Sequence, residues 1–371
     1  MTTRLRFALP ALAAVLLAVP AAKAADTAPD AKELQATLDK AYDYLKGKQG
    51  ADGNWVPRVG PGVTALTAAA LVKAGKPADD PVVKKAIEYV EKFAQKDGGV
   101  YNRGLETYTT ALAIVAFKEC NTGGKYDKVI EAAVKYLRGV QESNGADDKE
   151  LKFGGAGYGK DSRPDTSNTG FFVEALIASG AGKDDPAVKK ALTFLSRAQN
   201  LPGEYNDQPF AKKAGDDDLG GFVYEPGAQG DEKSPKRTAA GGLRSEGGMT
   251  YVGLKSFLYA GVDKTDKRVK AAVEWVRKHY TLDENPGMKT AGLFYYYHTF
   301  AKAMDALGED EFADAKGTKH AWRKELFDKL KGTQAKDGSW VNTDASFMEN
   351  SPELCTAFAV LSLSYTKAAK K

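Results

Sequence analysis

The feature that most constrains the fold of this chain is a sequence pattern that recurs six times along it. Six apolar segments align on a single threonine, and seven residues later each has a leucine, a phenylalanine or an alanine. The threonines are Thr64, Thr110, Thr169, Thr250, Thr299 and Thr356. One repeat of this kind cannot bury its apolar surface alone, so it must stack on its neighbours. The threonine itself, in the first turn of a helix, is expected to bond backbone groups locally.

An amphipathic segment precedes each apolar one, and five of these end in a glutamine. The copies are YLKGKQGADGNW at 44–55, FAQKDGGVY at 93–101, YLRGVQESNG at 136–145, FLSRAQN at 194–200 and KLKGTQAKDGSW at 329–340. A degenerate sixth copy, WVRKHYTLDENPG at 275–287, has Tyr280 at the glutamine position. Glycine permits the left-handed turn that ends a helix, and the glutamine side chain can bond backbone groups across it.

The two kinds of segment differ in apolar pattern. YDKVIEAAVKYLRGVQ carries its apolar residues on one stripe, as an outer helix does, whereas TGFFVEALIASG is apolar nearly all round. Six such pairs with short turns predict an all-α fold, an (α/α)6 toroid whose inner helices run parallel around a central cavity. An open solenoid is the alternative. Six units of alternating burial favour the closed ring.

The N-terminus indicates export. Residues 1–24 combine Arg4 and Arg6, an apolar run and the cleavage signal Ala22-Lys23-Ala24, as a secretory signal peptide does. The run is too short to span a membrane. We therefore expect a periplasmic or secreted protein with no membrane span and a single toroid domain over 25–371. Removing the three basic leader residues lowers the formal charge from +4 to +1, which gives no reason to expect nucleic acid as a partner.

The two cysteines, Cys120 and Cys355, are too few for metal clusters of the CxxC type. In the repeat register they are offset by about 11 residues, or roughly 16 Å along parallel helices. Bridged Cα atoms lie only about 4.4–6.8 Å apart. We expect two free thiols.

The stretches QGADGNW and QAKDGSW, together with the aligned inner segments, resemble the squalene cyclase and protein prenyltransferase superfamily over residues 31–366. Hopene-type members carry an Asp-x-Asp-Asp-Thr motif whose central aspartate protonates the substrate. Asp165 and Thr169 match the frame of that motif, but Ser167 and Asn168 replace its two other acids. A hydroxyl group cannot protonate an alkene. The resemblance therefore implies the fold without cyclase activity.

Prenyltransferases of this superfamily hold zinc through an aspartate, a cysteine and a histidine. The segment YYYHTF matches His298 to the histidine, while Glu246 and Gly248 occupy the other two positions. Because the thiolate is missing, we expect neither metal nor cofactor. A rearranged zinc site of Glu246, His298 and Cys355 is one alternative. The other is a histidine packed in an aromatic cavity wall with a satisfied ring nitrogen.

The position four residues before the threonine is acidic in three consecutive repeats, at Glu106, Asp165 and Glu246. Such acids cap helices, and Asp165 is a good N-cap candidate. They could also gather at the mouth of the cavity. With aromatic neighbours, of which Tyr297 and His298 are expected to face the opening, the candidate ligand-binding residues are Glu106, Tyr108, Asp165, Asn168, Glu246, Tyr251, Tyr297, His298 and Cys355.

Two loops, 142–163 and a long insertion near 200–244, interrupt the spacing and suit a lid or a partner-binding rim. Three functions remain open. The chain is a toroid that binds a small molecule, polymer or protein; an extracellular polysaccharide lyase or hydrolase that uses the acidic rim; or an isoprenoid-processing enzyme, a terpene cyclase or prenyltransferase. The first is favoured, because neither a G-x-S-x-G nor a thioester motif is present.

Overall fold

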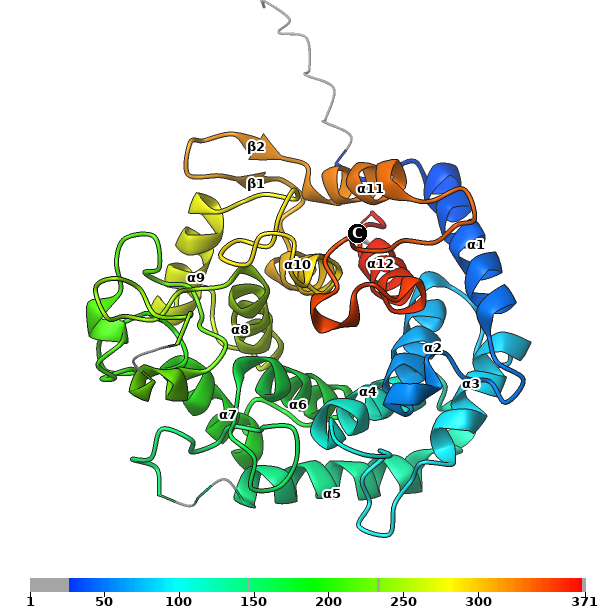
Figure 1. Cartoon of the computed structure of the whole chain (residues 1–371), viewed down its shortest axis with the longest axis horizontal. Helices are drawn as coiled ribbons and strands as arrows, with labels where there is room; N and C mark the ends of the chain where they lie inside the picture. Colours follow the sequence, from blue (N-terminus) through cyan, green and yellow to red (C-terminus); the bar gives the residue numbers. More distant parts are fainter. Residues whose placement is uncertain (1–26, 144, 146, 232–233, 369–371) are drawn as a thin grey trace, which may run out of the picture.

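A computed structural model describes residues 27–143, 145, 147–231 and 234–368, so the expected leader lies outside the described residues. Twelve α-helices of the described chain form two concentric rings (Figure 1). The outer helices are α1 (Ala31–Lys48), α3 (Pro81–Glu91), α5 (Asp127–Ser143), α7 (Pro186–Arg197), α9 (Lys267–Lys278) and α11 (Trp322–Thr333). The inner helices are α2 (Gly62–Ala74), α4 (Glu106–Glu119), α6 (Thr166–Ala178), α8 (Gly247–Tyr259), α10 (Leu293–Leu307) and α12 (Pro352–Ser364).

Short elements fill the connections. Five 3₁₀ turns occur in the described residues: η1 (Pro57–Val59), η2 (Thr122–Gly124), η3 (Ala211–Lys213), η4 (Pro226–Gly230) and η5 (Ser346–Met348). A small antiparallel ribbon joins β1 (Phe312–Ala313) to β2 (Lys319–His320), with Phe312 opposite His320. No helix in the described ranges has the length and apolar character needed to cross a membrane.

The inner helices contact one another in chain order, and α12 closes the ring by packing on α2 (Figure 1). Inner helices are buried on nearly every face, whereas an outer helix such as α5 buries one stripe that includes Ala133, Leu137 and Val140. This division follows from the two apolar patterns, since a helix between two layers meets apolar neighbours all round. The prediction of an all-α toroid is confirmed, and the open solenoid is excluded.

The repeated threonines belong to the scaffold. Five of them accept a hydrogen bond at Oγ1 from the backbone N–H of an extended residue before the inner helix, at 3.0–3.1 Å. These pairs are Thr64 with Trp55, Thr110 with Val100, Thr169 with Ala156, Thr250 with Phe222 and Thr356 with Trp340. Thr299 differs, because its hydroxyl donates to Tyr296 O of its own helix. In α10 the hydroxyls of Tyr296 and Tyr297 hold the preceding segment instead, by donating to Thr281 O and Leu282 O.

Four of the repeated glutamines join one outer helix to the next. In these repeats Nε2 donates both to a glycine carbonyl in the connection that follows it and to a carbonyl of the following outer helix. The acceptors are Gly53 and Val82 for Gln49, Gly154 and Ala187 for Gln141, Gly220 and Arg268 for Gln199, and Gly338 and Thr37 for Gln334. The fifth glutamine, Gln95, bonds only within its own turn, to Phe93 O and Tyr101 O.

Both cysteines are buried and free, as expected. Cys120 ends α4, while Cys355 lies in the first turn of α12, where its thiol donates to Glu349 O at 3.0 Å. The positions at opposite ends of inner helices keep the two sulfur atoms apart.

Candidate functional site

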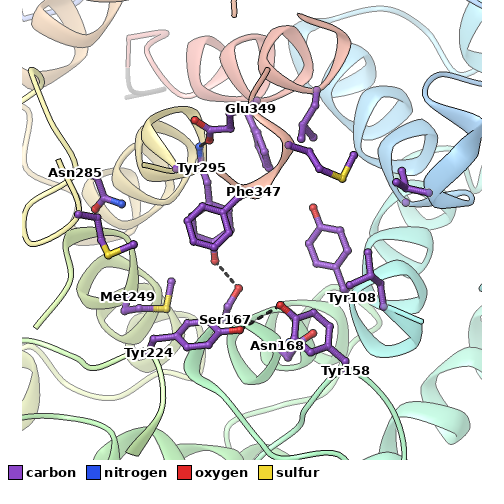
Figure 2. A pocket seen from close by; sticks show the side chains of 18 of the residues that line it. Tyr108, Tyr158, Ser167, Asn168, Tyr224, Met249, Asn285, Tyr295, Phe347 and Glu349 are labelled. Atoms are coloured by element: carbon purple, nitrogen blue, oxygen red, sulfur yellow. Dashed lines mark hydrogen bonds between the residues drawn. The ribbon is translucent and has the colours of Figure 1, made fainter. Parts of the chain in front are cut away.

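A cavity of about 420 Å³ opens where the inner helices begin, and all six of them contribute to its wall. The helix residues that line it are Gly62 and Val63, Tyr108 and Thr109, Ser167 and Asn168, Met249, Tyr295, and Leu354 with Phe358. Figure 2 shows Tyr108 and Tyr295 extending into this space from opposite sides. Their rings are fixed by edge-on contacts, Tyr108 on Phe171 at 4.8 Å and Tyr295 on Phe358 at 5.9 Å between centroids. Such a wall suits an apolar ligand.

The start of α6 supplies two polar side chains of this wall, Ser167 and Asn168. Asp165 caps the helix, since its Oδ1 accepts from Asn168 N at 2.8 Å and its Oδ2 accepts from Asn168 Nδ2 at 2.7 Å. Ser167 Oγ and Tyr295 Oη share a hydrogen bond of 2.9 Å across the cavity edge (Figure 2). Burial raises the pKa of Asp165 to about 6, and the Glu225 carboxylate acts in the same direction. The capping role predicted for Asp165 is therefore confirmed.

Both long loops reach the cavity mouth. Tyr158, from the first loop, and Tyr224, from the second, join their hydroxyls at 3.1 Å (Figure 2). Lys236, also from the second loop, forms an ion pair with Glu246. Burial raises the pKa of Glu246, while Lys236 opposes the rise. Sequence reasoning missed these three loop residues, and the irregular loop lengths were the only signal that pointed to them.

The loop before α12 completes the mouth. Glu349 accepts hydrogen bonds from Phe294 N at 3.1 Å and Tyr295 N at 2.8 Å, so it caps α10, whose own cap residue Gly292 has no side chain. Beside it, Phe347 and Met348 have left-handed backbone with φ of 55° and 64°. The Phe347 side chain is 64% exposed and lines the cavity. Non-glycine residues held in left-handed backbone cluster at ligand-binding and active sites.

The structure places only some of the nine candidate residues in the cavity wall. Tyr108, Asn168 and Glu246 line the cavity. Asp165 lies directly behind Asn168, and Glu106 accepts a hydrogen bond from Tyr136 at 2.9 Å. Asp165 thus caps a helix, Glu106 bonds a tyrosine and Glu246 pairs with a lysine. The three acids do not form one free cluster.

The other four candidates are absent from the cavity wall, which corrects the expectation that Tyr297 and His298 face the opening. Tyr297 turns outward to Leu282 O, and Tyr251 packs on Tyr296 and Phe300. His298 and Cys355 are also buried. Tyr295, two residues before Tyr297 in α10, lines the cavity instead.

The rearranged zinc site is not assembled. Among the described residues, no three His, Cys, Asp or Glu side chains are grouped so that they could hold a metal ion. Glu246 is paired with Lys236, and the Cys355 thiol meets Glu349 O. His298 packs among Phe171, Tyr295 and Phe358. This aromatic setting agrees with the alternative interpretation.

Comparison with known proteins agrees with this architecture. Residues 60–216 match the family model of the squalene-hopene cyclase C-terminal domain. A squalene-hopene cyclase from Schizosaccharomyces japonicus is 26% identical over 203 residues, which make up 48% of this chain and 31% of that protein. The chain thus matches about a third of the length of that relative.

Two solved structures, from Actinoplanes and Salmonella enterica, share the helical fold. A protein from Actinoplanes superposes on 90% of this chain and 100% of its own, with a TM-score of 0.54 and 14% identity. A possible member of the GH105 family from Salmonella enterica covers 91% of this chain and 94% of its own, with a TM-score of 0.52 and 12% identity. The type II terpene cyclase MstE from Scytonema covers 91% and 98%, with a TM-score of 0.35 and 14% identity.

The fold and its cavity define an α/α-toroid protein. Within that class, residues 60–216 are similar to the squalene-hopene cyclase C-terminal domain, in agreement with the repeat motifs.

Proposed function

We propose that this chain is a binding protein for a small, mostly apolar molecule, without cyclase or prenyltransferase activity. The observation that carries the proposal is the cavity of about 420 Å³ at the start of the inner helices, with its fixed aromatic wall. Preformed apolar cavities of this size, with few polar groups, are typical of small-ligand sites. The leader-like residues 1–24 support a role after export, in the periplasm or outside the cell.

The chemistry at the start of α6 supports binding without cyclisation. Protonation of an alkene needs a strong acid that points into the cavity. Asp165 is a weaker acid than usual, because burial raises its pKa to about 6, and its carboxylate is held by Asn168. Ser167, at the position of the acid in the cyclase motif, bonds to the Tyr295 hydroxyl.

The proposal is tested with the fluorescent apolar probe N-phenyl-1-naphthylamine. We expect the wild type to bind it, and Met249→Trp and Leu354→Trp to bind it at least about tenfold more weakly, since each fills the cavity from a different helix. Leu219→Trp, at a site 42% exposed and outside the cavity wall, serves as the control. Melting temperatures establish that the variants are folded. Equal binding by filled and unfilled cavities would contradict the proposal, as would conversion of squalene to a cyclic product.

A further inference from the structure

Tyr108 carries a hydroxyl that the fold itself does not use. The ring reaches into the cavity from α4, and no hydrogen bond joins its Oη to any other residue that the structure describes (Figure 2). The oxygen can be reached from the cavity, because Tyr108 is only half-buried. In contrast, the unpartnered oxygens Thr107 Oγ1 and Asn168 Oδ1 are fully buried. A phenylalanine at position 108 would therefore serve the fold equally well.

The surroundings of this ring give its hydroxyl a fixed place. The ring stands edge-on to Phe171 of α6, at 4.8 Å between centroids. It also packs on α2, where a Cβ atom at Gly62 would lie 3.6 Å from Tyr108 Cε1. Burial raises the pKa of Tyr108 above its ordinary value, so the hydroxyl keeps its proton at neutral pH. A donor that is already positioned loses little conformational freedom when a ligand binds.

Two pairs of hydroxyls in the wall also have protons to spare. Ser167 and Tyr295 share one hydrogen bond, and Tyr158 and Tyr224 share another. In each pair one O–H donates to the other oxygen, so the second proton is not used within the pair. A phenol oxygen is also a better donor than acceptor, because its lone pair is delocalised into the ring. The free polar capacity of these hydroxyls is therefore mainly that of donors.

The stronger acceptors of the wall are already engaged by the protein. Glu246 forms an ion pair with Lys236. Glu349 accepts hydrogen bonds from two backbone N–H groups at the start of α10, and Asn285 Oδ1 accepts from Gly248 N at 3.0 Å. A ligand that must donate a proton meets little to accept it, whereas a ligand that accepts meets the free hydroxyl of Tyr108.

We propose that the cavity selects an apolar molecule with a carbonyl group, whose oxygen accepts a hydrogen bond from Tyr108 Oη. The inference rests on the proposed binding function and specifies its ligand class. A carbonyl oxygen has two lone pairs and no proton, so it needs no acceptor from the wall. A hydrocarbon of the same shape leaves the Tyr108 hydroxyl without a partner, and a site that hydrogen-bonds its ligand discriminates against such an analogue.

The experiment uses three naphthalenes of nearly the same shape. 2-Acetylnaphthalene carries the carbonyl, 2-isopropenylnaphthalene has CH₂ in place of the oxygen, and 1-(2-naphthyl)ethanol has a hydroxyl there. Dissociation constants are measured for the wild type and for Tyr108→Phe, which keeps the ring and removes the hydroxyl. We expect the wild type to bind the ketone most tightly. In Tyr108→Phe, the preference for the ketone over the alkene should fall by about fivefold, the effect of one neutral hydrogen bond.

Tyr205→Phe is the matched control. It also removes a tyrosine hydroxyl, but Tyr205 is 39% exposed and lies outside the cavity wall. It should keep the wild-type preference for the ketone. Melting temperatures of the wild type and Tyr108→Phe should agree, because no hydrogen bond within the described chain is lost.

The outcomes separate the two proposals. If none of the three naphthalenes binds to the wild type, the binding function itself fails. If they bind but the preference for the ketone over the alkene is the same in wild type and Tyr108→Phe, the apolar cavity stands and carbonyl recognition is overturned. An equal loss of affinity for all three ligands in Tyr108→Phe also overturns it. Tighter binding of the alcohol than of the ketone by the wild type does so without any variant.

Discussion

His298 matches the position of a zinc-binding histidine in the sequence, but its surroundings do not supply that chemistry. The imidazole is buried among aromatic rings, near an ion cluster in which Lys255 and Lys302 both pair with Glu174. Phe358 lies 5.3 Å from it between centroids. Burial lowers the pKa of His298 well below its ordinary value, and the two nearby ammonium groups act in the same direction. The ring therefore packs as a neutral aromatic group.

We predict that His298→Phe raises the free energy of unfolding by about 1–2 kcal/mol at pH 7, because it replaces a buried polar ring among aromatic neighbours with an apolar one. Relative to the variant, the wild type also loses stability as the pH falls below about 6.5, since the unfolded chain then binds a proton that native His298 refuses. The variant lacks this loss. Urea unfolding at pH 7.5 and pH 5.5 measures both effects. A destabilisation at pH 7 would mean that the imidazole has a partner after all.

At the scale of single residues, the sequence predicted site residues whose position follows from the repeat. It missed site residues whose position depends on how the loops fold. Asn168 and Tyr108 were found because they flank the start of an inner helix. Tyr158 and Tyr224 could not be found, because their hydroxyls meet only after two loops fold over the same rim. Tyr297 was predicted to face the cavity because Thr299 aligns with the threonines of the other repeats. In the structure, the hydroxyls of Tyr296 and Tyr297, and not Thr299, hold the segment before α10.

At the scale of elements, the turns after the outer helices fix the spacing between repeats. Gly154 has φ of +78°, and a Cβ atom there would lie 2.0 Å from Lys190 O of the next outer helix. Gly53, Gly98, Gly220 and Gly338 stand in the same relation to a backbone carbonyl of their following helix, at 2.2–2.5 Å. The glycine turn was predicted for its left-handed backbone. Its second cause, the close approach of the next repeat, is visible only in the assembled ring.

We predict that Gly154→Ala lowers the free energy of unfolding by about 2–3 kcal/mol, because it adds both backbone strain and overlap with Lys190 O. The control is Gly139→Ala in the middle of α5, where a Cβ atom would meet nothing within 4 Å. That substitution should stabilise the protein by about 0.5–1 kcal/mol through helix propensity. Chemical denaturation of the three proteins distinguishes the effects. Equal changes in both variants would show that the turn tolerates a side chain.

At the scale of the whole molecule, the ring encloses a layered interior rather than an open channel. The apolar cavity lies where the inner helices begin, and the buried cluster of Glu174, Lys255 and Lys302 joins α6, α8 and α10 further along them. Both lysines are at most 4% exposed. A carboxylate shared by two buried ammonium groups is costly to disturb and fixes the mutual orientation of three helices. One end of the interior can therefore hold a ligand while the middle keeps the ring in shape.

Closure of this ring makes the first and last repeats part of one cooperative unit. Gln334 Nε2 donates to Thr37 O at 3.0 Å, as Gln141 Nε2 donates to Ala187 O at 2.9 Å within the ring. In an open solenoid the terminal helices would fray, whereas a closed ring protects them like the others. We predict that backbone amides of α1 and α12 exchange hydrogen as slowly as those of α5 and α6.

Gln334→Leu tests this closure, because it removes the bond across the junction of α11 with α1. We expect it to lower the free energy of unfolding by about 1–2 kcal/mol, the same amount as Gln141→Leu inside the ring, since each leaves two carbonyls without their donor. Exchange should accelerate throughout the molecule in both variants, as global unfolding becomes easier. Acceleration confined to α1 and α12 in Gln334→Leu would instead show that the ring opens at this junction, and that its closure is a separate, weaker equilibrium.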